Sequence, residues 1–326
     1  MIMQSSTFKI AIGAGVVLSG AVLVTYYFRG NRKTKRTRLI EMIPEIQKAH
    51  IHIKDPDRVE EIVTALIKGG RNKLQVISDF DRTITRYKCN GIILPTTHAI
   101  LEGSTVLSDE TKKRAQDLRD HYYPLEMSSK LSDDEKYSLM TEWWSQAHEI
   151  LIGSGINKKD VTDMVVQSNV MLREGCDQLF DLLASNSVPL LVFSAGIADI
   201  LHEVIKERAT MHDNMSIMSN QMEFNADGRL VGFKGKLIHT YNKREMAKIN
   251  QDYFDRNKNR TNVLLMGDTI GDLQMAEGLN PADNVLKIGF LNSHFENLEV
   301  YKSKYDIVIM DDSSMDVANA ILNKVM

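Results

Sequence analysis

Three short apolar runs in this sequence each end in small polar and acidic residues of types that can cleave a phosphate ester. They are 74–78 followed by Asp79-Phe80-Asp81, 190–193 followed by Ser194-Ala195-Gly196, and 262–266 followed by Gly267-Asp268, with Asp272 four residues later. A carboxylate can attack phosphorus and form an acyl phosphate. A second carboxylate two residues on can protonate the departing alkoxide and then deprotonate the attacking water. A hydroxyl followed by small residues offers hydrogen-bond donors to phosphoryl oxygens.

Attack on a dianionic ester also requires positive charge at the site. A hard divalent cation held by oxygen ligands meets this requirement, and Mg²⁺ suits such ligands best. A lysine can supply further positive charge, and three candidates precede the third apolar run: Lys234, Lys236 and Lys243. The sequence therefore predicts magnesium as the cofactor, together with one of these lysines.

The elements that must position these residues are strands of a parallel sheet. Each apolar run is short and is followed by a stretch with helical periodicity, and strands that alternate with helices indicate a parallel sheet with both faces covered. Ligands of such sheets bind beyond the carboxyl ends of the strands. A single aspartate there is as easily the N-cap of the next helix, but three clusters in one chain favour an active site. Upstream, 42–68 has a helical pattern that Gly69-Gly70 ends.

The N-terminal segment differs from the rest of the chain. No charged residue occurs from Ile10 to Phe28, a length sufficient to cross a bilayer core of about 30 Å. The segment is preceded by Lys9 alone and followed by Arg29, Arg32, Lys33, Lys35, Arg36 and Arg38. This asymmetry favours a signal-anchor transmembrane helix with a basic flank over 1–38, with the C-terminal side in the cytoplasm, at the endoplasmic reticulum or the outer mitochondrial membrane. A cleaved signal peptide would carry its basic residues in front, and a buried core helix is the other alternative.

Composition restricts the function of the remainder. The chain has 326 residues, 43% of them hydrophobic, and a formal net charge of -3. It therefore lacks the basic character of proteins that bind nucleic-acid polymers. Its two cysteines, Cys89 and Cys176, form neither a disulfide framework nor a metal-binding spacing, which indicates a reducing compartment.

The motifs DFDRT, SAG, a lysine and GDTIGD, in this order, resemble the four motifs of the haloacid dehalogenase superfamily of phosphatases. The longer stretches KLQVISDFDRTITRY, YYPLE, FSAGIADILHEVI and LLMGDTIGDLQMAEG are similar to those of the cytosolic type III 5'-nucleotidases. This resemblance implies an α/β fold with a Rossmann-like core, formed by 39–87 and 176–326, and a helical cap inserted at 88–175. Helical patterns at 109–122, 133–151 and 158–170 are compatible with such a cap.

The resemblance also implies roles for the motif residues. Asp79 would be the nucleophile and a magnesium ligand, and Asp81 the general acid and base, with its backbone carbonyl on the metal. Asp268 would be the second carboxylate ligand, and Asp272 would lie in the second shell of the metal. Ser194 and Ala195 would bind phosphate. Lys243 is preferred over Lys236 as the phosphate-neutralising lysine, because Lys236 lies nearer to glycines and is expected at the surface.

In this family the glutamate of the YY-x-x-E stretch binds the base, which implies that role for Glu126, with Tyr87 and Trp144 stacking on the ring. We expect Trp143 to pack in the core. Trp144 combined with Ala147 is similar to the branch that also hydrolyses 7-methylguanosine 5'-monophosphate. Because N7-methylation leaves a positive charge on guanine, aromatic rings would stabilise that base by cation–π attraction. The expected substrates are nucleoside 5'-monophosphates, namely 7-methyl-GMP, CMP and UMP.

One departure and several alternatives belong with this interpretation. Arg82 stands where the family usually has an uncharged residue, and we expect it to point to solvent. The alternatives are a haloacid dehalogenase-type phosphatase for another small phosphomonoester such as phosphoserine, a nucleoside phosphotransferase, and a membrane-anchored interaction protein without activity. The protein is expected to act as a monomer.

Overall fold

The computed structural model describes residues 38–126, 128, 130–278, 282–310, 312 and 314–326. The predicted transmembrane segment at 10–28 lies outside these residues. Among the helices that are described, none is both long enough and apolar enough to cross a bilayer. A short 3₁₀ helix, η1 (Leu39–Met42), belongs to an N-terminal unit that is separate from Ile43–Met326. All the other helices and strands that the structure describes belong to the second unit.

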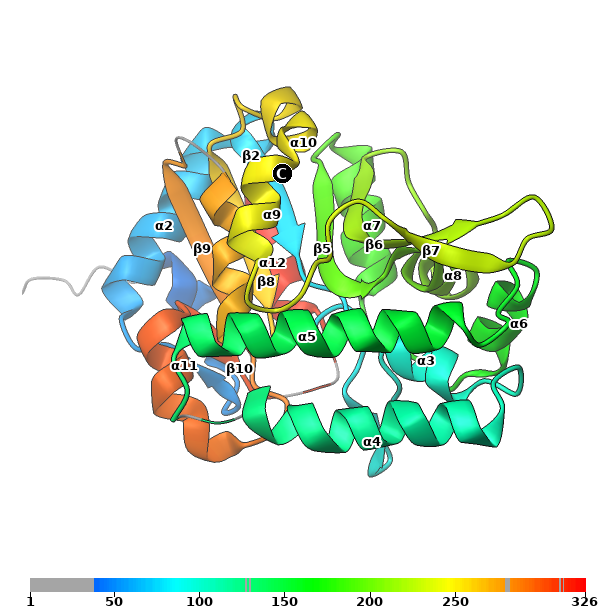
Figure 1. Cartoon of the computed structure of the whole chain (residues 1–326). Coiled ribbons are helices and arrows are strands. Elements are labelled where there is room, and N and C mark those ends of the chain that lie inside the picture. The colour runs from blue at the N-terminus through cyan, green and yellow to red at the C-terminus, as the bar shows by residue number, and fades with distance from the viewer. Residues whose placement is uncertain (1–37, 127, 129, 279–281, 311, 313) are drawn as a thin grey trace, which may run out of the picture. The chain divides into compact units, whose positions relative to one another are not determined.

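A mixed sheet forms the centre of this unit (Figure 1). In spatial order its strands are β1 (Ile51–His52), β10 (Ile307–Ile309), β9 (Asn284–Phe290), β8 (Asn262–Gly267), β2 (Leu74–Ser78), β5 (Leu190–Ile197), β6 (Met215–Phe224) and β7 (Leu230–Lys234). The six strands from β10 to β6 run parallel, and only the edge strands β1 and β7 are antiparallel to their neighbours. The predicted parallel α/β sheet is therefore confirmed.

The central strand β2 pairs with β8 on one side and with β5 on the other. Ile77 of β2 lies opposite Leu265 of β8 and opposite Leu191 of β5. Every residue of β2 and β8 is buried. Strands covered on both faces require apolar side chains at consecutive positions, which explains why the sequence shows continuous apolar runs here. The same pairing brings the carboxyl ends of all three runs to one edge of the sheet.

Helices cover both faces of the sheet. The face that includes Ile77, Phe193 and Leu265 packs against α9 (Lys243–Ile249), α10 (Gln251–Arg256) and the 3₁₀ helix η4 (Ile270–Gly278). On the opposite face α2 (Pro56–Gly69), α7 (Cys176–Ser185) and α12 (Asp316–Val325) pack together (Figure 1). The remaining elements of the core are α8 (Ala198–Arg208), α11 (Leu298–Lys304), η2 (Pro44–Gln47), η3 (Arg71–Lys73) and η5 (Phe295–Asn297).

A helical insertion separates β2 from β5 in the chain. It contains the hairpin β3 (Lys88–Cys89) and β4 (Ile92–Ile93), then α3 (Thr97–Gly103), α4 (Asp109–Glu126), α5 (Asp133–Ile152) and α6 (Asp160–Gln167). The long helices α4 and α5 lie side by side (Figure 1). Ser132 begins α5 with a reciprocal capping box to Glu135, which fixes the helix start where the sequence predicts it. Helix α6 is shorter at both ends than the predicted 158–170.

Outside the helical insertion, two further predicted element boundaries are wrong. The helical pattern at 42–68 becomes a helix only from Pro56, because Asp55 accepts a hydrogen bond from Arg58 N as the N-cap and Pro56 favours the first helical turn. Strand β5 does not end at Phe193 but continues to Ile197. Ser194, Ala195 and Gly196 therefore belong to the strand and form the irregular stretch between Phe193, which pairs with Met218 of β6, and Ile197, which pairs with Asn220.

Candidate active site

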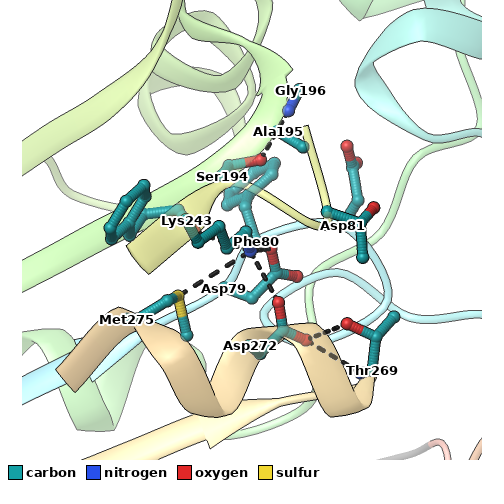
Figure 2. A network of polar contacts seen from close by, with 12 residues as sticks. Asp79, Phe80, Asp81, Ser194, Ala195, Gly196, Lys243, Thr269, Asp272 and Met275 are labelled. Carbon is teal, nitrogen blue, oxygen red and sulfur yellow. Dashed lines mark hydrogen bonds and ion pairs between the residues drawn. The ribbon is translucent and has the colours of Figure 1, made fainter. Parts of the chain in front are cut away.

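The centre of the site is a buried ion-pair network around Lys243, the first residue of α9 (Figure 2). Its Nζ lies 2.7 Å from Asp79 Oδ1 and 2.6 Å from Asp272 Oδ1, and it donates a third hydrogen bond to Phe193 O at 3.0 Å. Lys243 is 1% exposed. Burial alone would lower the pKa of the lysine, but the carboxylates of Asp272 and Asp79 outweigh burial and raise it, so the ammonium stays charged. Lys236 lies at the surface and pairs with Glu245, as expected.

Asp272 organises the loop after β8. Its Oδ2 accepts hydrogen bonds from Asp268 N at 3.0 Å and from the Thr269 backbone N and Oγ1 at 2.8 and 2.9 Å. A Cβ at Gly267 would lie 2.4 Å from the Cβ of Asp272, so only glycine fits where the strand turns into the loop. Because one oxygen of Asp272 holds the loop and the other holds Lys243, this side chain positions the groups around it.

Carboxylate oxygens of Asp79, Asp268 and Asp272 all lie within 4.8 Å of one another, which makes this cluster a candidate metal site. Burial raises the pKa values of Asp79 and Asp268 above the ordinary range, and the neighbouring carboxylates raise them further, against the opposing effect of Lys243. Three carboxylates around one ammonium, two of them buried and that of Asp268 half-buried, leave an excess of negative charge. Hard oxygen donors with uncompensated charge suit Mg²⁺.

Asp81 is held by the first residue of α3. Thr97 donates its backbone N–H to Oδ1 at 2.9 Å and its hydroxyl to Oδ2 at 2.7 Å. Burial raises the pKa of the Asp81 carboxyl, and the two bonds from Thr97 oppose that shift. A Cβ at Gly196 would lie 2.2 Å from Thr97 Oγ1 and 2.8 Å from Asp81 Oδ2. Gly196 therefore leaves the space in which the Asp81–Thr97 contact forms.

Ser194 and Ala195 are fixed by contacts of their own. The Oγ of Ser194, a residue 1% exposed, accepts a hydrogen bond from Gly196 N at 2.9 Å (Figure 2). The carbonyl of Ala195 accepts one from Asn220 Nδ2 at 2.7 Å, and the same amide group reaches Ile238 O at 2.8 Å. Asn220 thus links the end of β5 to the loop that leads to Lys243.

Glu126, at the end of α4, reaches the same loop from the helical insertion. Thr240 Oγ1 donates to Glu126 Oε1 at 3.2 Å, and the Tyr241 hydroxyl donates to Glu126 O at 3.4 Å. Burial raises the pKa of Glu126, partly offset by the bond from Thr240. Because Thr240 and Tyr241 stand just before Lys243 in the chain, the structure brings Glu126 to the loop that carries the site lysine.

The two aromatic residues expected to stack on a base do not contact each other among the described ring pairs. Trp144 packs against His98, with ring centroids 4.2 Å apart, and against Trp143 at 5.5 Å. Its Nε1 is buried without a hydrogen-bond partner. Tyr87 instead lies beside the guanidinium of Arg82. Trp143 stacks on Tyr122 but is only half-buried, so the expectation that it packs in the core is not met.

Two residues of this site were missed by sequence reasoning. Thr97, which binds Asp81, follows Thr96, the N-cap of α3, so a Thr-Thr pair before an apolar helical pattern was the available signal. Asn220 lies within β6 and carries no local signal, since its role depends on the pairing of β5 with β6. Sequence reasoning could not find a contact between segments whose pairing was unknown.

The parallel sheet, with its acidic strand ends and buried lysine, defines a phosphatase of the haloacid dehalogenase type. A haloacid dehalogenase family hydrolase from Salmonella enterica serovar Typhi superposes with a TM-score of 0.53 at 11% identity, over 78% of this chain and 73% of that one, and shares the fold. The chain is more similar to a crystal structure of cytosolic 5'-nucleotidase IIIB bound to cytidine, with a TM-score of 0.81 and 32% identity over 89% of this chain and 97% of the other.

Sequence comparison narrows the class further. The sequence profile of the pyrimidine 5'-nucleotidase family, UMPH-1, matches residues 82–326. A 7-methylguanosine phosphate-specific 5'-nucleotidase of Rattus norvegicus is 45% identical over 289 residues, which are 88% of this chain and 96% of the rat protein. The chain belongs to the pyrimidine 5'-nucleotidase family and is a 5'-nucleotidase.

Proposed function

We propose that the protein is a magnesium-dependent 5'-nucleotidase that hydrolyses 7-methyl-GMP, CMP and UMP through a phosphoryl group carried on Asp79. The observation that carries the proposal is the contact of Lys243 Nζ with the Asp79 carboxylate at 2.7 Å, inside a cluster of three carboxylates of which Asp79 and Asp272 are buried. The ammonium favours the ionised form of Asp79 and so opposes the rise in pKa that burial causes, and an ionised carboxylate is the form that attacks phosphorus.

The reaction is derived from the arrangement of the carboxylates. Asp79 forms a bond to phosphorus while the bond from phosphorus to the 5'-oxygen breaks, and Asp81 gives its proton to the departing oxygen. Water then attacks phosphorus, Asp81 takes a proton from it, and the bond between phosphorus and Asp79 breaks to release phosphate. The raised pKa of Asp81 suits a group that must start protonated. Ser194 and Ala195 would hold the phosphoryl oxygens.

Asp79, Asp268 and the carbonyl of Asp81 would hold the magnesium ion, and Asp272 would lie just behind it. When bound, the ion neutralises the phosphate and the charge that develops on it. The hydrogen bonds of Asp272 support this choice of metal ligands. Its Oδ1 already accepts a hydrogen bond from Lys243, and its Oδ2 accepts hydrogen bonds from the loop after β8. Asp268 is free of such side-chain bonds among the contacts that the structure describes.

The choice of base follows from the helical insertion and from the relatives. Glu126 would accept hydrogen bonds from the amino groups of cytosine or guanine, and Tyr87 and Trp144 would face the ring. The related rat enzyme is specific for 7-methylguanosine phosphate, and the related crystal structure holds cytidine. Residues 88–175 would act as the cap over a core of 39–87 and 176–326, because this stretch leaves the sheet after β2 and returns to it before β5.

The segment 1–38 would anchor the catalytic unit to a membrane from the cytoplasmic side. Support comes from the uncharged stretch at 10–28 and from the basic residues that follow it. Protease added to intact organelles should digest the catalytic unit if it faces the cytoplasm. Protection of that unit until the membrane is dissolved would contradict this orientation.

The central experiment measures phosphate release by the full-length protein with magnesium, from CMP, UMP, 7-methyl-GMP, AMP, GMP and phosphoserine. We expect release from CMP and 7-methyl-GMP and a loss of at least about a thousandfold in Asp79→Asn, because that change removes the nucleophile. Asp252→Asn, an exposed aspartate of α10, is the matched control and should keep full activity. Release from phosphoserine alone would refute the nucleotide assignment while leaving a phosphatase.

A further inference from the structure

Arg82 follows Asp81 directly and has an unusual backbone conformation. Its φ is +65°, in the left-handed region that non-glycine residues rarely occupy. The conformation is held from both sides, because Arg82 N donates to Thr85 Oγ1 at 2.8 Å while Arg82 O accepts from Arg173 Nη2 at 2.7 Å and from Asn292 Nδ2 at 2.9 Å. A strained backbone held by three hydrogen bonds next to an active-site aspartate indicates that the direction of this side chain matters.

The Arg82 residue is half-buried, so the expectation that it points to solvent is wrong. Its guanidinium carbon lies 5.2 Å from the centroid of the Tyr87 ring, a cation–π contact. The Nε is buried and has no hydrogen-bond partner within the described structure. A buried guanidinium nitrogen without a partner beside an active site leaves a donor free for a ligand.

The charge of Arg82 acts on both ends of the site. Its positive charge interacts with the carboxylates of Asp81 and Asp268 and with that of Glu126. Asp81 and Asp268 lie at the phosphate end, whereas Glu126 lies at the end proposed for the base. A nucleotide that extends from one end to the other must therefore pass through the field of Arg82.

We infer that Arg82 is a specificity-determining residue that selects nucleotides by charge: it attracts the phosphate of every substrate and disfavours a positively charged base on Tyr87. The second effect follows because a guanidinium and a cationic ring in contact with the same aromatic side chain repel each other. This inference rests on the proposed nucleotidase function and deepens it. It predicts that neutral pyrimidine bases are favoured over 7-methylguanine more strongly than they would be with a neutral residue at position 82.

The test compares kcat/KM for 7-methyl-GMP and CMP in the full-length protein and in Arg82→Gln and Arg82→Lys. Removing one like charge near the base should raise the 7-methyl-GMP/CMP ratio about fivefold in Arg82→Gln, with a higher KM for both substrates. Arg82→Lys keeps the charge and should keep the ratio. Arg256→Gln removes an exposed arginine of α10 and should change neither quantity.

Salt gives a second measurement that does not depend on a folded variant. Raising the salt concentration from about 0.01 M to about 1 M shortens the Debye length from about 30 Å to about 3 Å. The 7-methyl-GMP/CMP ratio of the wild-type protein should rise over this range, and the phosphate common to both substrates cancels in the ratio. A ratio that neither salt nor Arg82→Gln changes overturns the inference alone. A wild-type protein that hydrolyses no nucleotide overturns the proposed function and this inference with it.

Discussion

Replacing Lys243 with methionine tests how the site is held together. The change keeps a side chain of similar length but removes the ammonium that bonds to Asp79, Asp272 and Phe193 O. Removing one partner of a buried ion pair costs about 3–5 kcal/mol, because a charge is left buried without compensation. Lys243 and Asp272 are both 1% exposed, so solvent screens the network little. We expect Lys243→Met to lower the free energy of unfolding by about 4 kcal/mol.

Urea unfolding followed by circular dichroism measures this loss, and phosphate release measures the accompanying loss of activity. Lys248→Met, an exposed lysine in the same helix, is the matched control and should stay within about 0.5 kcal/mol of the wild-type protein. Asp272→Asn combined with Lys243→Met should be less destabilised than the sum of the two single variants, because neutralising Asp272 removes one of the charges that Lys243→Met leaves unpaired.

Two results would refute this reasoning. A loss below about 1 kcal/mol in Lys243→Met would mean that the buried carboxylates do not depend on the lysine for compensation. Additive losses in the double variant would mean that Lys243 and Asp272 do not act as a pair, contrary to their 2.6 Å contact.

Two further predictions concern packing around the site. Gly196→Ala places a Cβ against Thr97 Oγ1, so Asp81 should lose its hydrogen bond from the Thr97 hydroxyl. We expect kcat to fall about tenfold or more and its pH profile to shift. An unchanged kcat would contradict the role of Thr97. His148 stacks on Phe233, and burial lowers its pKa to about 4. In the unfolded chain this histidine has an ordinary pKa of about 6.5, so as pH falls it takes up a proton in the unfolded state before it does so in the folded state. Acidification therefore lowers the free energy of unfolding, by about 2 kcal/mol at pH 5. His148→Phe should lose less stability between pH 7.5 and pH 5 in urea unfolding than the wild-type protein, and equal losses would contradict this.

The strand ends were predictable because their physical signals are local. A run such as 74–78 is apolar at every position, which indicates a strand covered on both faces, and its boundary with Asp79 is visible in the residue types. The identity of the site lysine was predicted only through the resemblance to a family. Spacing alone left Lys234, Lys236 and Lys243 as equal candidates.

The environment of Arg82 was not predictable from the sequence. Its backbone conformation depends on hydrogen bonds from Arg173 and Asn292, which are 91 and 210 residues away in the chain. A left-handed arginine has no sequence signature comparable to that of glycine or asparagine. The interpretation of Arg82 as a surface residue therefore failed where long-range contacts decide the backbone.

The pairing of Asp79 with Lys243 also has a consequence for synthesis of the chain, because the two residues are 164 positions apart. At about 5–20 residues per second, Lys243 leaves the ribosome roughly 10–30 s after Asp79. Strand β2 lacks its neighbour β8 for even longer, since β8 begins at Asn262. During this interval an apolar strand edge and an unpaired carboxylate are accessible to chaperones and to other nascent chains. Under the proposed mechanism, hydrolytic activity therefore requires that the chain has been made beyond Asp268 of the fourth motif.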